Sequence, residues 1–332
     1  MNTTSRLTIT LIALLIATLA CGRPTTSAAP LPPVTHPFDY YGWIYFFYGE
    51  TNNDLARISS YTNTAFAISP EQVKILKSFG FEHIIYILNE QAPLEIIYSD
   101  AEQTMPADVA TFHEQIFPDY REKFFTAYRQ SLAQTKDLLI SAGVYDQIDQ
   151  FYIADEPAFH RNVYLDQDFL NQYADEFKLV FTEKQSSMTF AATDDPQVVS
   201  ARPESGPHFD PPPSLDVIMV DPYFYDFFGE VEVSCERTAI QKWLYQDNPL
   251  SNINWAKQFD KPIIVVGDAE IRGGQSAKDC HITETYALLK DDPAIAGLVW
   301  FIYDKEYDEG NYIRGAANDP HLVEVIENLG RK

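Results

Sequence analysis

The feature of this chain that most constrains its fold is the alternation of short apolar runs with segments of helical pattern. Eight runs rich in Val, Ile, Phe and Tyr have the length and composition of strands, and seven of them are followed by a plausible helix. The runs are residues 41–48, 64–68, 83–88, 150–154, 188–192, 217–220, 263–266 and 298–303. Because strands that alternate with helices pair in parallel, this order predicts a parallel sheet.

Three observations favour a closed barrel over an open, doubly wound sheet. The runs number eight, they are apolar enough to be buried on both faces, and no glycine-rich phosphate-binding fingerprint follows any of them. We therefore predict an α/β protein with a single (β/α)8 barrel over residues 38–332. The local pattern is clearest around the second helix, where Ser69 is the expected N-cap, Pro70 opens the helix, Gln72 completes a capping box and Gly80 ends it. The proline-rich stretch 193–214 predicts irregular structure instead of a fifth helix.

The first 21 residues have the pattern of a secretory signal. Arg6 precedes an apolar run at residues 11–16, which closes on small residues up to Ala20 and Cys21. The run is shorter than a membrane span, and no later window is both long and free of charge. We expect residues 1–21 to be a signal peptide and residues 22–37, rich in Pro, Thr, Ser and Ala, to be an extended tether.

The end of the signal resembles a bacterial lipoprotein lipobox. Ala20 precedes Cys21 and Gly22 follows it, although Thr18 stands where a branched aliphatic residue is usual. The resemblance implies that Cys21 carries a lipid and that the protein is an exported lipoprotein, anchored to a membrane and facing the periplasm or the cell surface. An ordinary signal peptide cut nearby is the alternative.

The two other cysteines, Cys235 and Cys280, follow the sixth and seventh runs. Those strands are neighbours in a barrel, so an exported chain predicts a disulfide between their loops. Two unrelated buried thiols are the alternative.

Composition excludes several classes of function. The formal net charge of −24, without a basic run, argues against a nucleic-acid partner. The histidines have no metal-ligand spacing, and neither a Gly-x-Ser-x-Gly elbow nor a phosphate-binding loop is present. We expect no metal and no cofactor.

Acidic residues follow most of the later runs. They are Asp155, Glu156, Asp194, Asp195, Asp221, Asp268, Glu270 and Asp304. In (β/α)8 barrels the chemistry lies at the carboxyl ends of the strands, so these side chains are predicted to gather at one rim. Like charges gathered in this way repel one another, so their presence at one rim indicates a function.

The segment Phe-Tyr-Ile-Ala-Asp-Glu-Pro at 151–157 resembles the fourth-strand signature of the large retaining clan of (β/α)8 glycoside hydrolases. The resemblance implies that Glu156 is the acid/base and that a carboxylate after the seventh strand is the nucleophile. Asp268 and Glu270 stand there, on one face by the strand period of two. We prefer Glu270, because the clan's nucleophile is a glutamate and a β-bulge could place Glu270 at that position. The chemistry needs one protonated and one ionised carboxyl, roughly 5 Å apart for retention.

The chain departs from the clan pattern at two positions. Asp155 stands where the clan commonly has Asn, which can donate a hydrogen bond to a sugar hydroxyl where an ionised Asp cannot. Gly267 occupies the place where the nucleophile would follow the apolar run. These departures keep a second hypothesis open, a non-catalytic carbohydrate-binding or surface-scaffold lipoprotein with a degenerate glycosidase barrel.

Aromatic residues in or just past the strands are the candidates for sugar contact, since flat rings stack on sugar faces. Together with Asp155 and Asp304, the predicted substrate-binding residues are Trp43, Tyr45, Tyr223, Tyr225 and Trp300. Trp300 is similar to the sugar platform that ends the clan's eighth strand. The two resemblances thus imply a glycoside hydrolase that acts on an oligo- or polysaccharide, with a carbohydrate substrate and a membrane as its partners.

Overall fold

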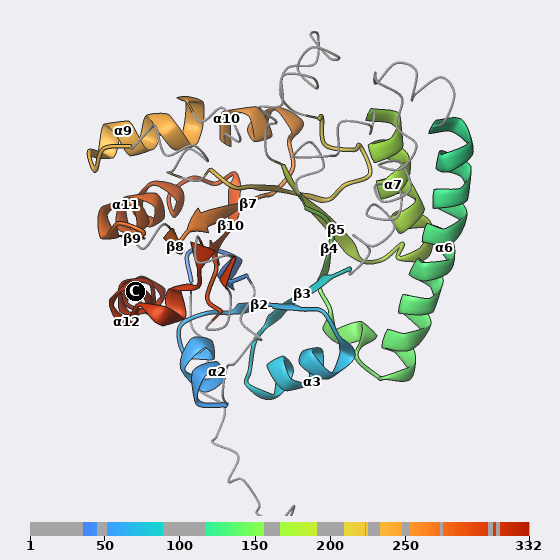
Figure 1. The fold of residues 1–332 in the computed structure, drawn as a ribbon, viewed down its shortest axis with the longest axis horizontal. Coiled ribbons are helices and arrows are strands. Elements are labelled where there is room, and N and C mark those ends of the chain that lie inside the picture. The colour runs from blue at the N-terminus through green and yellow to red at the C-terminus, as the bar shows by residue number, and fades with distance from the viewer. Residues whose placement is uncertain are drawn as a thin grey trace, which may run out of the picture. The chain divides into compact units, whose positions relative to one another are not determined.

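Eight parallel strands form a closed barrel, as the sequence predicts. The computed structural model describes residues 36–44, 52–88, 117–155, 167–190, 209–222, 224, 233–247, 253–272, 275–304, 308–309 and 313–331. Around the barrel the strands follow the order β1-β10-β7-β6-β5-β4-β3-β2 (Figure 1). They are β1 (Tyr40–Trp43), β2 (Thr64–Ala67), β3 (His83–Ile87), β4 (Gln150–Ala154), β5 (Gln185–Phe190), β6 (Val217–Val220), β7 (Ile263–Asp268) and β10 (Ile295–Phe301).

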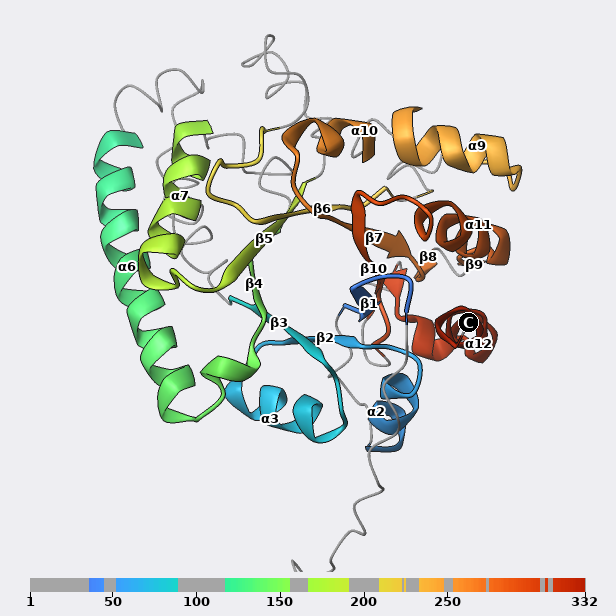
Figure 2. The same cartoon turned by 180° about the vertical axis from the view of Figure 1, so that it is seen from behind.

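Helices surround the strands on the outside of the barrel (Figures 1 and 2). They are α2 (Asn52–Ser59), α3 (Pro70–Ser78), α6 (Phe117–Ser141), α7 (Gln167–Val180), α9 (Arg237–Lys242), α10 (Ile253–Ala256), α11 (Asp279–Leu289) and α12 (Pro320–Gly330). Short helical turns cover Tyr145–Gln147, Trp243–Asp247, Lys257–Phe259 and Ala316–Asn318. In the described part of the chain, no helix combines the length and apolarity that a membrane span requires.

Local sequence explains how α3 begins and ends. The Ser69 hydroxyl accepts a hydrogen bond from the Gln72 N–H at 3.3 Å, and the Gln72 side chain accepts one from the Ile68 N–H at 2.7 Å. Pro70 occupies the first turn, and Gly80 adopts φ +89° just after the helix. The predicted cap is confirmed, with Gln72 reaching back one residue beyond the N-cap.

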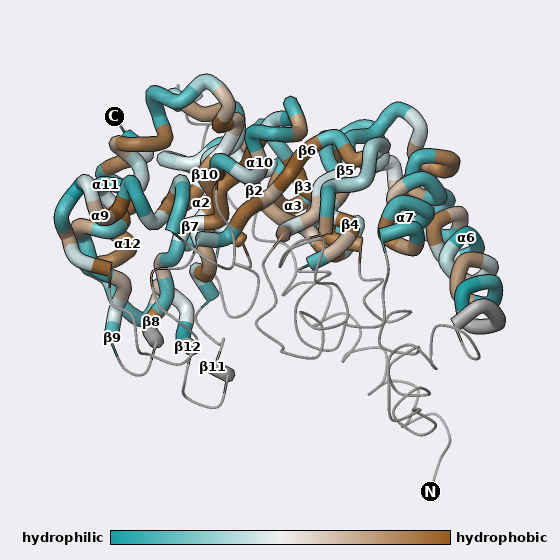
Figure 3. The backbone as a smooth tube through the Cα atoms, turned by 90° about the horizontal axis from the view of Figure 1, so that it is seen from above, coloured by the Kyte–Doolittle hydropathy of each residue, from teal (hydrophilic) through white to brown (hydrophobic). Residues whose placement is uncertain are grey.

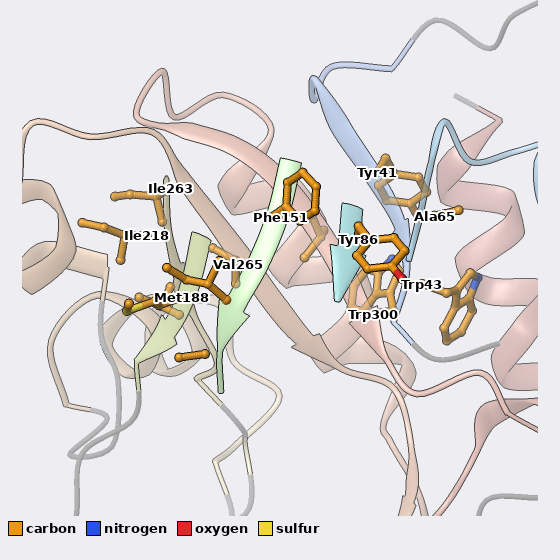
Figure 4. Packing of buried hydrophobic residues seen from close by; sticks show 14 of the residues in the cluster. Tyr41, Trp43, Ala65, Tyr86, Phe151, Met188, Ile218, Ile263, Val265 and Trp300 are labelled. Carbon is orange, nitrogen blue, oxygen red and sulfur yellow. The ribbon is translucent and has the colours of Figure 1, made fainter. Parts of the chain in front are cut away.

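The barrel strands separate two apolar layers, because successive side chains point to opposite faces of a strand. The inner layer contains side chains of the strands and their ends alone: Ile44, Phe66, Ile85, Ile87, Tyr152, Val217, Met219, Ile264, Val266 and Val299, with Tyr40, Ile68 and Phe301 partly buried against them. The outer layer joins the strands to the helices and is larger. Figure 4 shows part of it, and Figure 3 shows brown apolar segments in the strands beside helices banded in teal and brown.

Several strand boundaries differ from the predicted ones, and in β5 and β7 the differences lie at residues of low apolarity. β7 continues through Gly267 and Asp268, which pair with Trp300 and Phe301 of β10. β5 begins at Gln185, three residues before the predicted run. At the start of the described chain, His36 lies in the predicted tether, yet its Nε2 is 2.8 Å from the Tyr61 carbonyl.

A small antiparallel sheet connects the segments that follow β7 and β10. Its strands are β8 (Ile271–Arg272), β9 (Gln275–Ser276), β11 (Asp308–Glu309) and β12 (Ile313–Arg314), in the order β11-β12-β8-β9. Figure 3 shows them together on one side of the barrel strands. They adjoin the carboxyl ends of β7 and β10, where a barrel enzyme has its site.

Candidate active site

The predicted acidic rim is present at the carboxyl end of the barrel. Asp155 directly follows β4, Asp221 follows β6, and Asp268 is the last residue of β7. Glu270 and Asp304 lie two and three residues beyond the ends of β7 and β10. Asp155 is exposed, whereas each of the other four is at most 2 % exposed. Glu156, Asp194 and Asp195 lie outside the described residues.

The end of β7 turns one carboxylate toward the barrel axis. Ile264 and Val266 belong to the inner layer, so the period of two puts Asp268 on the same face. Pairing with β10 persists to this point, and the Ala269 N–H donates to the Phe301 carbonyl at 2.8 Å just beyond it. Asp268 is therefore held by regular strand structure.

Gly267 allows this close pairing. A Cβ at Gly267 would lie 2.6 Å from two ring carbons of Trp300, closer than real Cβ atoms approach. The glycine that departs from the clan pattern thus has a packing role, since only the absent side chain leaves room for the indole.

Glu270 lies in the turn from β7 into the small sheet. Its carbonyl accepts a hydrogen bond from the Ala277 N–H at 2.9 Å, and its side chain is buried. Both nucleophile candidates are thus buried at the same end of the barrel. They differ in support, because Asp268 is the last residue of β7 and Glu270 lies in the turn that follows.

The end of β4 brings Asp155 to the inner side of the rim. The Tyr152 hydroxyl donates a hydrogen bond to Asp155 Oδ1 and lies 2.8 Å from Thr189 Oγ1 on β5. The β4–β5 pairing shifts register between Tyr152 and Ala154, which marks a bulge. Without it, strict alternation would send Asp155 to the outer face with Phe151 and Ile153, so the bulge re-aims the carboxylate.

The two tryptophans proposed for sugar contact lie elsewhere. Trp43 and Trp300 belong to the outer layer and are at most 1 % exposed (Figure 4). The Trp43 indole donates to the Tyr61 hydroxyl at 3.0 Å and packs edge-on against Tyr303. Neither indole presents a face to a ligand, because each is enclosed between strands and helices.

Phe301 is the aromatic residue of β10 that faces inward, and sequence reasoning missed it. It packs against the inner layer and is paired in register with Asp268. Strand alternation is the signal that could have found it, since Val299 and Phe301 share the face opposite to Trp300. The other predicted aromatic contacts, Tyr45, Tyr223 and Tyr225, lie outside the described residues.

The predicted disulfide between Cys235 and Cys280 is confirmed. It joins the segment that leads from β6 to α9 with the first turn of α11. His281, the next residue, reinforces the connection, because its Nε2 lies 2.9 Å from the Val233 carbonyl and its ring stacks on Phe224 with centroids 4.3 Å apart. Burial lowers the pKa of His281, which favours the neutral ring.

Within the described ranges, the one group of three His, Cys, Asp or Glu side chains close enough to hold a metal ion is Cys235, Cys280 and His281. Its two sulfur atoms are bonded to each other in the disulfide. Because a metal ion binds cysteine as the thiolate, the bonded sulfur atoms do not serve as ligands.

Comparison with known proteins identifies the architecture. Neither a family profile nor a curated protein sequence matches this chain. Among solved structures, a β-D-glucuronidase of Dictyoglomus thermophilum superimposes with a TM-score of 0.50 at 13 % identity, over 82 % of this chain and 45 % of that one. An endo-1,4-β-D-mannanase of Thermotoga petrophila does so with a TM-score of 0.50 at 11 % identity, over 79 % and 78 %. The chain thus spans less than half of the glucuronidase. At these identities the likeness defines the fold, a (β/α)8 barrel.

Proposed function

We propose that this protein is a glycoside hydrolase that cleaves an oligo- or polysaccharide with two carboxyl groups. The observation that carries the proposal is the position of acidic residues at the ends of β4 and β7. These strands are three apart in a ring of eight, so groups at their carboxyl ends face one another across the mouth. The glucuronidase and the mannanase named above, which share the fold, support the same class of activity.

In the proposed reaction, Glu156 protonates the oxygen of the leaving sugar while a carboxylate of β7 attacks the anomeric carbon. The bond to the leaving group breaks and a glycosyl ester forms on Asp268 or Glu270. Glu156, now ionised, then removes a proton from a water molecule that hydrolyses the ester. Asp155 accepts a hydrogen bond from a sugar hydroxyl beside the cleaved bond.

The experiment that tests the acid/base assignment compares wild type with Glu156→Gln on a panel of polysaccharides and aryl glycosides. Positioned acid catalysis contributes about 10² to 10⁴ in rate, so the variant should lose that much activity on a natural glycan. Aryl glycosides with good leaving groups need less protonation and should be less affected. Glu82→Gln is the matched control, because Glu82 is exposed just before β3, at the opposite end of the barrel.

Asp268→Asn and Glu270→Gln identify the nucleophile. Loss of the nucleophile abolishes turnover of natural and aryl substrates alike, so one variant should do this and the other should not. Wild-type activity in Glu156→Gln would refute the assignment. A wild-type protein that binds glycans and cleaves none would favour the binding-scaffold hypothesis instead.

We also propose that the protein is exported and anchored to a membrane through Cys21. The support is the signal-like pattern of residues 1–21, the Ala20-Cys21-Gly22 junction and the tether-like composition of residues 22–37. The disulfide agrees with an oxidising compartment.

A further inference from the structure

We infer that Tyr152 is a positioning residue that orients the Asp155 carboxylate for catalysis. The inference rests on the proposed glycosidase function and deepens it. Tyr152 lies within the segment that resembles the clan signature, but the resemblance implies no role for it.

The geometry forms a hydrogen-bond relay across two strands. The single phenolic proton of Tyr152 goes to Asp155 Oδ1, so the Thr189 hydroxyl donates to the Tyr152 oxygen, 2.8 Å away. Thr189 and Tyr152 are buried, whereas Asp155 is exposed. The relay therefore connects a buried hydroxyl of β5 with a carboxylate at the rim of the barrel. Successive hydrogen bonds of this kind strengthen each other.

Asp155 needs such support because the chain there leaves regular strand structure. The bulge after Tyr152 interrupts the regular alternation of β4, and β4 ends at Ala154. An exposed carboxylate at such a point samples several rotamers unless a partner fixes it. The hydroxyl of Tyr152, three residues earlier in the same strand segment, is such a partner.

The contact also defines what Asp155 can recognise. A carboxylate offers about four acceptor sites, so Asp155 can accept from a ligand while Oδ1 accepts from Tyr152. A carboxylate accepts and does not donate, so the matching group is a sugar hydroxyl or amine that donates. Because Asp155 is proposed to hold a sugar hydroxyl beside the cleaved bond, a shift of its carboxylate would misplace the substrate, and a misplacement of about 1 Å lowers the rate by about 100-fold.

The test uses Tyr152→Phe, which deletes the hydroxyl and keeps the ring. That ring packs edge-on against Phe66 with centroids 6.4 Å apart, so phenylalanine preserves the apolar contact. Tyr86→Phe is the matched control, since the Tyr86 hydroxyl donates to the carbonyl of Ile68, the residue that follows β2. Thr189→Val removes the first donor of the relay, and Thr189→Ser restores it.

We expect Tyr152→Phe to lower kcat on β-1,4-manno-oligosaccharides, or on the panel glycan that wild type cleaves best, by about 10-fold to 100-fold with a smaller change in KM. Tyr86→Phe should stay within about twofold of wild type, and Thr189→Ser should recover most of the activity that Thr189→Val loses. Since Tyr152 acts through Asp155, adding Tyr152→Phe to Asp155→Asn should cost little more than Asp155→Asn alone.

The inference is overturned if wild type is active and the losses of Tyr152→Phe and Asp155→Asn multiply, or if Tyr152→Phe behaves as Tyr86→Phe does. If wild type binds a glycan without cleaving it, the glycosidase proposal fails. The same non-additive pattern must then be found in the binding affinity. If wild type neither binds nor cleaves any glycan, both proposals fall together.

Discussion

Removal of the Cys235–Cys280 disulfide should destabilise the protein by about 4 kcal/mol. The two cysteines are 45 residues apart, and the loss of chain entropy on closing a loop of that length in the unfolded state corresponds to about 4 kcal/mol. The His281 contacts to Val233 and Phe224 remain in the variant, so the native connection between α11 and the segment before α9 should persist. The loss should therefore come mainly from the unfolded state.

Urea unfolding of wild type and Cys235→Ala/Cys280→Ala, followed by tryptophan fluorescence, measures this difference. If the free energy of unfolding falls by about 3 kcal/mol per M of urea, the urea concentration at the unfolding midpoint should be roughly 1.3 M lower in the variant. Reductant should move wild type to the midpoint of the double variant and leave that variant unchanged. A difference below about 1 kcal/mol would contradict the reasoning, as would mass spectrometry of unreduced wild type that finds both thiols free.

Three further predictions concern packing, pH and anchoring. Gly267→Ala should lower stability by about 1–3 kcal/mol and reduce activity, because its Cβ would overlap Trp300 beside Asp268; wild-type urea stability would refute this. Burial lowers the pKa of His281, so the unfolded chain binds its proton more readily and the free energy of unfolding should fall as pH drops below about 6.5. The decrease in the free energy of unfolding between pH 7 and 5 should be smaller in His281→Gln than in wild type. An equal decrease in both would show that His281 does not cause it. Cys21→Ser should release the protein from membranes; unchanged partitioning and processing would show that Cys21 carries no lipid.

The fold could be predicted from the sequence because each strand is an apolar run bounded by turn residues. The predicted and observed bounds agree for 150–154 and 217–220, where the runs end sharply at polar residues. The prediction is less accurate for β7. Gly267 and Asp268 are poor strand formers, and only their pairing with β10 keeps them in the strand.

The face of a residue was harder to predict than its strand. Trp300 resembles a sugar platform in sequence, yet the register of β10 turns it outward and Phe301 inward. A shift of one residue exchanges the two faces of a strand. A residue-by-residue motif match cannot detect such a shift, whereas the alternation of Leu298 and Trp300 with Val299 and Phe301 can.

The relay and the small sheet had no local signal. The Tyr152–Asp155 contact depends on a bulge, which is set by the pairing of β4 with β5. The strands β8, β9, β11 and β12 are two residues each, too short for any periodicity. Such features arise from tertiary pairing, so they emerge only once the barrel is assembled.

The most direct test of the central claim is covalent trapping of the glycosyl intermediate. Wild type is incubated with a 2-deoxy-2-fluoro glycoside of the sugar that the substrate panel identifies, and the digested protein is mapped by mass spectrometry. A two-carboxylate retaining mechanism predicts one added glycosyl group, on a peptide that contains Asp268 and Glu270, and none at Glu156. Hydrolysis with inversion of the anomeric centre, or an adduct on a residue outside the segment after β7, would contradict the account.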